Sequence, residues 1–339
     1  MNIHMNLGEN SYDIKVERGI LKKVSEELNL NRKVFVITDS GVPKQYAQAV
    51  AAQCKDGHIA TVETGEESKS IAVFESLLKK MLELGFTRGD CVVAVGGGVV
   101  GDLSGFVASA YMRGVDFYNI PTTVLSQIDS SIGGKVAVNV DGIKNIVGAF
   151  YQPKKVIIDP DVLSTLPQRQ ISNGLSEAVK MSLTFNEEIF RIFENENPWD
   201  NIDKIIIESL KLKKFVVEQD EKESGLRKVL NFGHTIGHAI ESDTNLSELY
   251  HGECVALGMI PMCSEIVRQR LIPVLQKLNL PTKVSCNPDA VIEAMSHDKK
   301  VKNGKVTAIF VEKAGSYVMK DMPCDELKAG IELVREKGE

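Results

Sequence analysis

The sequence lacks the features of several specialised protein classes. Its six cysteines are scattered, and no two of them form a CxxC pair. Residues 1–13 contain Asn, His and Glu and no apolar segment, so we expect no signal peptide. The longest apolar stretches, near 91–100 and 254–263, are too short to cross a bilayer. These absences exclude a disulfide scaffold and predict a cytoplasmic protein with reduced thiols.

An excess of charge of one sign is also missing. The 339 residues contain 40 Lys and Arg against 46 Asp and Glu, which gives a net charge of −6. This balance favours neither nucleic acid nor an anionic membrane as a partner. With 43% hydrophobic and 25% charged residues, the chain has an ordinary globular composition. An anionic small substrate would therefore need a local cluster of basic residues.

The first half of the chain alternates between strand and helix patterns. We expect strands at 33–39, 59–63, 91–95, 117–121 and 155–159, and helices at 43–54 and 70–84. The segments then become long and helical, at 172–184, 186–195, 199–220, 227–242 and 251–270, with a further helix at 323–339. The pattern predicts an α/β domain with a parallel sheet at 1–168 and a helical domain at 169–339.

A glycine-rich turn directly follows the apolar strand at 91–95. Gly96, Gly98 and Gly101 fit the pattern GxGxxG. Glycine lets backbone N–H groups approach a pyrophosphate, and the start of the next helix favours an anion. The turn therefore indicates a nucleotide, although a tight turn without a ligand has the same pattern. The acid that contacts the ribose is either Asp116 or Asp39, and the spacing leaves both open.

Lysines and small polar residues gather between 121 and 145. Lys135 follows two glycines, but Val136 stands where a P-loop has Ser or Thr, so a P-loop NTPase is disfavoured. Lys144 and Asn145 follow closely. A single lysine is usually a solvated surface cation, whereas two lysines and an amide beside glycines can hold a phosphate.

The segment 227–242 carries the most informative pattern. As one helix, it would place Arg227, Asn231, His234 and His238 within about 60° of one another, with apolar residues opposite. A solvated helix face is normally rich in Lys and Glu. A buried histidine with satisfied hydrogen bonds would explain one member of this stripe but not four. We therefore interpret the stripe as part of a binding site.

Metal ligands are available in the same region. His234 and His238 have the i, i+4 spacing at which two histidines can share a metal. Thr235 replaces the Glu of HExxH, so a zincin protease is disfavoured. His251 opens the next helix, and Glu177 on an earlier helix offers a carboxylate. A catalytic zinc site takes three protein ligands, and the spacing does not choose two histidines among these three.

Taken together, these motifs resemble the 3-dehydroquinate synthase family of sugar phosphate cyclases over essentially the whole chain. The matching stretches are 96–102, 111–114, 121–123, 129–135, 144–148, 177–180, 226–241 and 251–253. The resemblance implies an N-terminal Rossmann-like domain that binds NAD and an all-helical C-terminal domain that binds Zn²⁺ or Co²⁺. It also implies a homodimer.

The resemblance also implies a reaction. The substrate would be 3-deoxy-D-arabino-heptulosonate 7-phosphate, and the products 3-dehydroquinate and phosphate, in the shikimate pathway to chorismate and the aromatic amino acids. NAD would oxidise a ring hydroxyl transiently, phosphate would leave, the ketone would be reduced again, and the opened ring would close as a carbocycle. The leaving phosphate can act as its own base.

Site residues follow from the resemblance position by position. The implied metal ligands are Glu177, His234 and His251. The implied phosphate contacts are Lys135, Asn145, His238 and Lys299 (or Lys300 beside it), with Arg113 reaching in from the other subunit. Carboxylate contacts would be Lys213 and Arg227, and groups that order hydroxyls and metal-bound water would be Asp129, Lys180 and Asn231. The implied NAD contacts, which favour Asp39 over Asp116, are Asp39, Glu66, Lys69, Gly97, Gly98, Asp102, Thr122, Thr123, Lys135, Lys144 and Thr165.

Three alternatives differ in their chemistry. A related cyclase such as 2-deoxy-scyllo-inosose synthase takes a substrate without a carboxylate, and Arg227 with Asn231 favours the carboxylated one. A polyol dehydrogenase, similar to glycerol dehydrogenase, would release its oxidised product, and the many lysines argue against it. A non-enzymatic NAD-binding protein would leave the stripe at 227–238 without a purpose.

Overall fold

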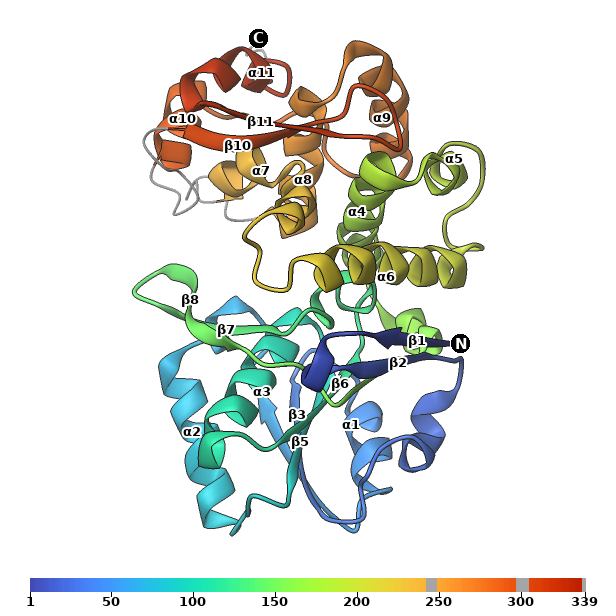
Figure 1. Cartoon of the computed structure of the whole chain (residues 1–339), viewed down its shortest axis with the longest axis vertical. Coiled ribbons are helices and arrows are strands. Elements are labelled where there is room, and N and C mark those ends of the chain that lie inside the picture. Colours follow the sequence, from blue (N-terminus) through green and yellow to red (C-terminus); the bar gives the residue numbers. More distant parts are fainter. Residues whose placement is uncertain (242–248, 297–304, 337–339) are drawn as a thin grey trace. The chain divides into compact units, whose positions relative to one another are not determined.

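The structure is a computed structural model that describes residues 1–241, 249–296 and 305–336 (Figure 1). Lys299 and Lys300, two of the predicted phosphate contacts, lie outside these residues. The chain forms two compact units. One unit comprises Met1–Leu166 with Lys213–Glu221, and the other comprises Pro167–Leu212 with Lys222–Glu339.

The first unit is built on a seven-stranded sheet in the order β1-β2-β9-β6-β5-β3-β4. In that order the strands are Asn2–Met5, Tyr12–Val16, Lys155–Ile158, Asp116–Pro121, Cys91–Gly96, Lys33–Asp39 and Asp56–Val62. Strand β1 pairs antiparallel with β2, and the remaining neighbours pair in parallel. Helix α1 (Lys44–Ala51) covers one face, and α2 (Ile71–Glu83) and α3 (Gly98–Ala110) cover the other (Figure 1). The predicted α/β fold with a parallel sheet is confirmed.

The side chains of the central strands explain why both faces are covered. In β3, Val34 and Val36 pack on the face of α1, whereas Phe35 and Ile37 pack on the face of α2 and α3. Every residue of β5 is buried. A strand that is apolar on both faces is stable only between two layers, because each face must be removed from water.

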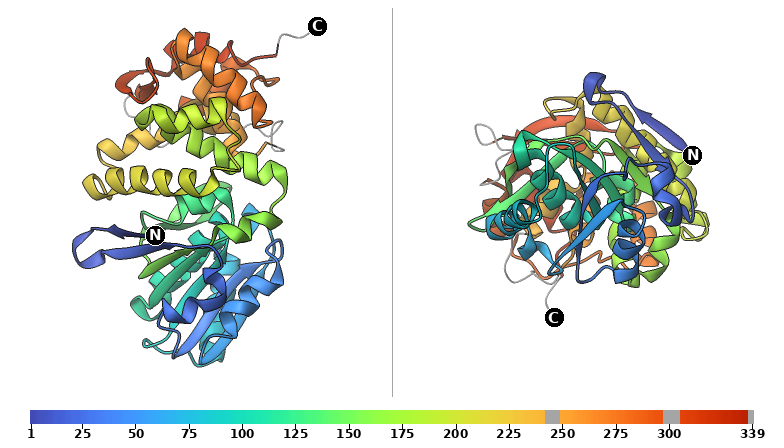
Figure 2. Two further views of the ribbon diagram at one scale, coloured as in Figure 1. Left: turned by 90° about the vertical axis from the view of Figure 1, so that its right-hand side faces the viewer. Right: turned by 90° about the horizontal axis from the view of Figure 1, so that it is seen from below.

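Two hairpins of this unit were not predicted. Strands β1 and β2 form the edge of the main sheet at the N-terminus (Figure 2). Strands β7 (Lys135–Val140) and β8 (Ile143–Phe150) form a separate two-stranded sheet. Neither hairpin carries the continuous apolar run that marks β5, and most residues of β8 are exposed.

The second unit is largely helical. Its helices are α4 (Gln168–Phe185), α5 (Glu187–Asn195), α6 (Ile202–Gln219), α7 (His234–Glu241), α8 (His251–Met259), α9 (Glu265–Lys277), α10 (Pro288–Ser296) and α11 (Lys328–Ile331). The end of α6, from Lys213, is grouped with the first unit. A hairpin of β10 (Lys305–Phe310) and β11 (Val318–Pro323) corrects the expectation that this region is helical throughout.

Two of the expected long helices are interrupted. The segment 227–242 is a short 3₁₀ helix (Leu226–Asn231), a break, and then α7. At the break, Gly233 has a φ of +76°, and a Cβ there would lie 2.7 Å from Met259 Cγ. The segment 251–270 breaks around Pro261, because proline cannot donate the next helical hydrogen bond. Ser264 then caps α9 through the Val267 N–H.

The tail also differs from expectation. Instead of one helix at 323–339, β11 runs to Pro323 and is followed by a 3₁₀ turn and the short helix α11. The six cysteines all lie in the described residues and form no disulfide. In the described part of the chain, each helix is too short or too polar to span a membrane.

Candidate functional site

The glycine-rich turn joins β5 to α3 in the first unit. Gly97 is the N-cap of α3, and a Cβ on it would lie 3.0 Å from the Thr123 Cγ2. A Cβ on Gly98 would lie 3.1 Å from the Ser130 hydroxyl. The turn is therefore tightly enclosed by the segment that follows β6. The N–H groups at the start of α3 give this turn the geometry of an anion site.

The structure separates the two candidate ribose acids. Asp39 ends β3, so it lies at the same edge of the parallel sheet as the turn after β5. Its Oδ1 accepts hydrogen bonds from the N–H groups of Gly41 (2.8 Å) and Val42 (3.1 Å). Burial raises the pKa of Asp39, and these N–H groups oppose that rise. Asp116 begins β6 at the opposite edge and pairs with Arg32 at 2.7 Å, which leaves Asp39 as the better candidate.

Three other predicted contacts converge around the buried Lys69. Its Nζ lies 2.8 Å from Asp102 Oδ2 and 3.7 Å from Glu66 Oε1, and it also donates to Asn145 Oδ1. Burial raises the pKa of Asp102, and the Lys69 ammonium opposes that rise. Asn139, which sequence reasoning missed, donates to Glu66 Oε1 at 2.9 Å and accepts from the Asn145 N–H at 2.8 Å. These bonds connect residues predicted to hold NAD with one predicted to hold the phosphate.

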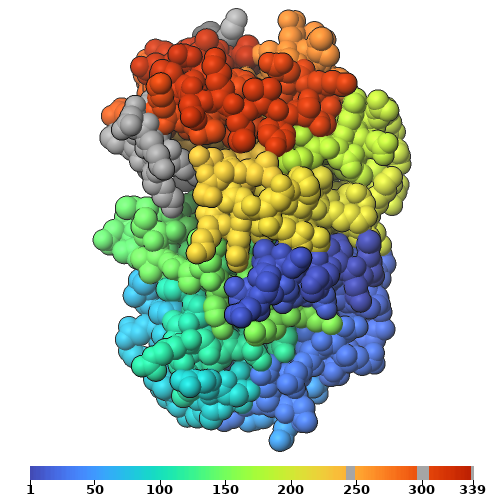
Figure 3. Space-filling model, viewed as in Figure 1, coloured from blue at the N-terminus to red at the C-terminus, as the bar shows by residue number. Residues whose placement is uncertain are grey.

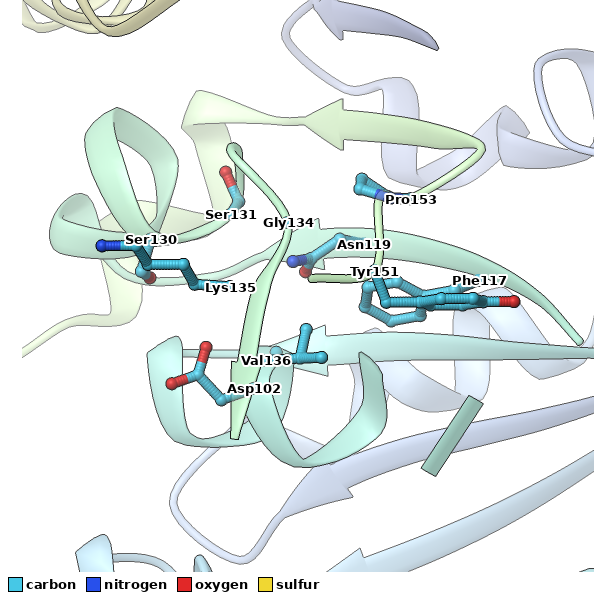
Figure 4. Close-up of a pocket in the computed structure, with 11 residues that line it drawn as sticks. Asp102, Phe117, Asn119, Ser130, Ser131, Gly134, Lys135, Val136, Tyr151 and Pro153 are labelled. Atoms are coloured by element: carbon cyan, nitrogen blue, oxygen red, sulfur yellow. The ribbon is translucent and has the colours of Figure 1, made fainter. Parts of the chain in front are cut away.

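A small cavity of about 10 Å³, about enough for one water molecule, lies beside this cluster. Its polar lining comes from Asp102, Asn119, Ser130, Ser131 and Lys135. In Figure 4 the side chains of Asp102, Ser130 and Lys135 lie at one end of the cavity, and two aromatic rings lie at the other. The cavity therefore lies between helix α3 and the start of β7, which carries Lys135.

Asp129 and Lys213, two further predicted site residues, contact each other in the first unit. The Lys213 ammonium lies 2.5 Å from the Asp129 carboxylate and 2.5 Å from its backbone carbonyl. Lys213 is buried, and it comes from the end of α6. Sequence analysis assigned the two residues to different parts of the substrate, and the structure shows them as an ion pair.

The remaining predicted contacts of this unit hold turns or lie on the surface. The N–H of Thr122 donates to the carbonyl that ends β5 (2.9 Å), and the hydroxyl of Thr123 lies 2.7 Å from a serine hydroxyl. The hydroxyl of Thr165 lies 3.1 Å from that of a tyrosine. Lys144 on β8 is exposed. Arg113 is also exposed, and its φ of +68° belongs to a tight turn after α3.

In the second unit, one carboxylate and three imidazoles converge. Glu177 lies on α4, His234 and His238 on α7, and His251 on α8. Glu177 Oε1 lies 3.5 Å from His234 Nε2 and 3.6 Å from His251 Nε2. Two ligands of a tetrahedral zinc with bonds of about 2.1 Å lie roughly 3.4 Å apart. The ring nitrogens of the three histidines also lie within 4.8 Å of one another.

The ring nitrogens turned away from Glu177 are held by acceptors. His234 Nδ1 lies 3.1 Å from the Phe232 carbonyl, and His251 Nδ1 lies 3.0 Å from Glu241 Oε2. A carbonyl and a carboxylate only accept, so each ring in its neutral form carries the proton on Nδ1 and presents a lone pair at Nε2. Glu177 Oε1 is buried and accepts no hydrogen bond within the described chain. Two lone pairs and a buried carboxylate facing one another require a cation, so these residues fit a divalent metal.

The ionisation of the cluster agrees with that conclusion. Burial opposes the charge of Glu177, but the Lys180 ammonium and His251 outweigh burial and lower the pKa of Glu177 to about 2. Burial would lower the pKa of His251, but the nearby carboxylates of Glu177 and Glu241 raise that pKa to about 9. In this metal-free geometry a proton takes the place that a cation would occupy.

Three further predicted site residues come from the same sequence motifs as the metal ligands. They are Lys180, Arg227 and Asn231. Lys180 forms an ion pair with Glu177 Oε2 and donates to a backbone carbonyl at 2.7 Å. Arg227 is buried, and the amide of Asn231 donates to Glu223 at 2.8 Å. Because the chain breaks at Gly233, these two residues do not share a helix face with the histidines, and the one-helix interpretation was wrong.

The spacing of the ligands depends on contacts that the sequence did not reveal. The Gly252 N–H donates to Asn173 Oδ1, and the Ser176 hydroxyl donates to the Gly252 carbonyl, both at 2.6 Å. Arg169 forms a two-point ion pair with Glu253, at 2.6 and 2.8 Å. These bonds tie the start of α8 to α4, and so set the position of His251 relative to Glu177.

Comparison with known proteins covers both units. Residues 59–173 match the family model for the 3-dehydroquinate synthase N-terminal region, and residues 174–301 match that for the C-terminal region. A 3-dehydroquinate synthase of Enterococcus faecalis is 40% identical over 97% of this chain and 98% of its own length.

Solved cyclases share the fold. A 2-deoxy-scyllo-inosose synthase with carbaglucose-6-phosphate, NAD⁺ and Co²⁺ is 25% identical, with a TM-score of 0.88 over 98% of this chain and 99% of its own. A 2-epi-5-epi-valiolone synthase from Streptomyces hygroscopicus with NAD⁺ and Zn²⁺ is 26% identical, with a TM-score of 0.88 over 97% of this chain and 98% of its own. The sequence identity to the synthase of Enterococcus faecalis is higher than that to either solved cyclase. Together with the two family models, it shows that the chain belongs to the 3-dehydroquinate synthase family.

Proposed function

We propose that this chain converts 3-deoxy-D-arabino-heptulosonate 7-phosphate into 3-dehydroquinate and phosphate, with NAD and Zn²⁺ or Co²⁺ as cofactors. Membership of the family carries the proposal. The convergence of Glu177, His234 and His251 supports it, because the reaction needs a metal site with an open position. The six cysteines, which form no disulfide, are compatible with a cytoplasmic setting, where we place the reaction.

In this proposal each of the two domains holds one cofactor. The domain at 1–168 would hold NAD through the turn after β5, Asp39 and the Lys69 cluster. The domain at 169–339 would hold the metal through Glu177, His234 and His251. When bound, NAD takes up and returns a hydride, and the metal polarises the hydroxyl that is oxidised. Lys180 forms an ion pair with Glu177 Oε2, which favours the ionised carboxylate and would leave Oε1 to hold the metal.

Basic and amide groups would hold the two anionic ends of the substrate. Lys135, Asn145 and His238 suit the phosphate, because ammonium, amide and imidazole groups all donate hydrogen bonds to it. Lys213 and Arg227 suit the carboxylate, and Arg227 can form the planar two-point contact that lysine cannot. Asp129 and Asn231 would accept from or donate to the ring hydroxyls. The leaving phosphate can take up the proton beside the new ketone, so this account assigns no separate base.

Comparing two phosphorylated sugars tests the proposal. Metal-loaded protein with NAD should release phosphate from the heptulosonate phosphate at least about 1,000-fold faster, by kcat/KM, than from glucose 6-phosphate. The reason is that a site built for a charged group rejects an analogue that leaves its buried Arg227 unpaired with a carboxylate. Equal release from both sugars, or a preference for glucose 6-phosphate, would instead support a cyclase for uncharged sugars.

We also propose that the active form is a homodimer joined through β8. This strand is the open edge of a two-stranded sheet, and its unit presents it on the surface (Figure 3, green). Ile143, Ile146, Val147 and Phe150 are 38–55% exposed, which is a large apolar group for one strand. Arg113, predicted to reach the other subunit, follows Met112, which is 40% exposed.

Sedimentation measures this assembly. We expect Ile146→Lys to dissociate the dimer because it places a charge in an apolar contact, and Leu82→Lys, at an exposed position on α2, to leave it intact. A parent protein that sediments as a monomer, or an Ile146→Lys variant that stays dimeric, would contradict the assignment of β8.

A further inference from the structure

Glu241 is a carboxylate beside the metal cluster that the predicted ligands and substrate contacts leave without a role. It lies on α7, and its Oε2 lies 3.0 Å from His251 Nδ1. The Glu241 side chain is 17% exposed and that of His251 is 31% exposed, so water screens the contact only in part. The Nδ1 of His234, in contrast, lies 3.1 Å from a backbone carbonyl.

The contact determines which nitrogen of His251 is available. An ionised carboxylate only accepts hydrogen bonds, so His251 donates from Nδ1, and in the neutral ring that binds a metal its Nε2 keeps a lone pair. That Nε2 is the atom 3.6 Å from Glu177 Oε1. A negative partner on Nδ1–H also increases the electron density of the ring, which strengthens Nε2 as a ligand.

Glu241 lies on the same helix as His234, α7. Helix α7 packs closely on α8, since a Cβ on Gly237 would lie 2.8 Å from the Cys254 carbonyl. One helix therefore carries both His234 and the partner of His251.

We propose that Glu241 is a positioning residue of the metal site, which holds His251 in the Nδ1–H form and raises the affinity of its Nε2 for the metal. This inference rests on the metal site of the proposed function. It holds whether the remaining ligands are Glu177 and His234 or include His238, because His251 belongs to both sets.

Metal binding, measured apart from turnover, tests the role of Glu241. The parent, Glu241→Gln and Glu241→Ala are stripped of metal and titrated with Zn²⁺ against a chromophoric chelator. Glu265→Gln, at an exposed position at the start of α9, is the matched control. We expect the Zn²⁺ dissociation constant to rise about 10-fold for Glu241→Gln and about 100-fold for Glu241→Ala, and to stay unchanged for Glu265→Gln.

Two further measurements separate positioning from a structural role. The visible absorption of bound Co²⁺ reports the ligand field, and it should shift in Glu241→Gln but not in the control. The thermal unfolding midpoint of the metal-free variants should match that of the metal-free parent. The inference is overturned if Glu241→Gln binds Zn²⁺ and absorbs with Co²⁺ as the parent does. It is also overturned if the metal-free variant loses as much stability, relative to the metal-free parent, as the variant loses in the free energy of Zn²⁺ binding. A parent that binds no metal would instead refute the metal site of the proposed function.

Discussion

Removing the metal with a chelator should lower turnover at least about 1,000-fold, and Zn²⁺ or Co²⁺ should restore it. The stabilisation of a developing alkoxide by a metal is worth several kcal/mol, and about 4 kcal/mol corresponds to this factor. Glu177 Oε1 is buried and lies 3.5 and 3.6 Å from the Nε2 atoms of His234 and His251, a spacing that suits a shared metal. Steady-state rates and elemental analysis of the same samples measure the effect. Full turnover in protein shown to be metal-free would contradict it.

Histidine variants identify which rings bind the metal. We expect His251→Ala to lose the metal, because its Nε2 faces Glu177 Oε1 at 3.6 Å. His238→Ala should keep the metal and lose turnover, because we assign His238 to the substrate phosphate. Its ring centroid lies 5.1 Å from that of His234, so a ligand role is geometrically open to it. Loss of metal from His238→Ala and retention in His251→Ala would reverse the assignment.

The second large effect is expected from Gly258→Ala, which should destabilise the second unit and empty its metal site. A Cβ at Gly258 on α8 would lie 1.9 Å from the Gly233 carbonyl and 2.7 Å from the Gly237 N–H nitrogen. Both contacts are backbone atoms, so α7 and α8 must move apart. Overpacking of this kind costs about 3 kcal/mol or more, and for a unit of roughly 150–250 residues this lowers Tm by about 6–12 °C.

A matched glycine separates this clash from a general cost of alanine. Gly89 has no neighbour closer than 3.9 Å to its Cβ position, so Gly89→Ala should change Tm little. Calorimetry and bound zinc per chain are measured for both variants. Because α7 carries His234 and α8 carries His251, Gly258→Ala should also lose zinc. A Gly258→Ala variant with the Tm and zinc content of the parent would show that the two helices do not need this contact.

The sequence predicted the parts of the fold that are determined locally. The apolar run at 91–95 became β5, buried on both faces, and the glycines after it became the turn into α3. These elements can be predicted from the sequence for two reasons. A parallel strand must bury both faces, and glycine permits a close approach of the backbone.

The breaks in the expected helices followed from tertiary contacts instead. The apolar residues of 227–242 keep a helical period, and Phe232 and Ile236 are buried as that period predicts. Gly233 nevertheless interrupts the helix, because its backbone is left-handed and Met259 packs where a Cβ would stand, and the period encodes neither. The signal that could have indicated the break is Gly233 itself, a glycine inside a helical pattern that is followed by the histidines His234 and His238.

Pairs that are distant in sequence could not be predicted either. Lys213 meets Asp129 across 84 residues, and Arg169 meets Glu253 across the same separation. Even the contact between His251 and Glu241, which are only ten residues apart, depends on how α7 packs against α8. Charge and spacing show that such groups exist, whereas the packing of helices decides which of them meet.

The most direct test of the central claim is the amount of product formed per NAD. The metal-loaded protein is given the heptulosonate phosphate and a small, known amount of NAD, and phosphate, dehydroquinate and NADH are measured together. The account predicts that phosphate and dehydroquinate form in equal amounts that far exceed the NAD present, with no net accumulation of NADH. One NADH formed for each substrate consumed, with no release of phosphate, would contradict it and indicate a dehydrogenase.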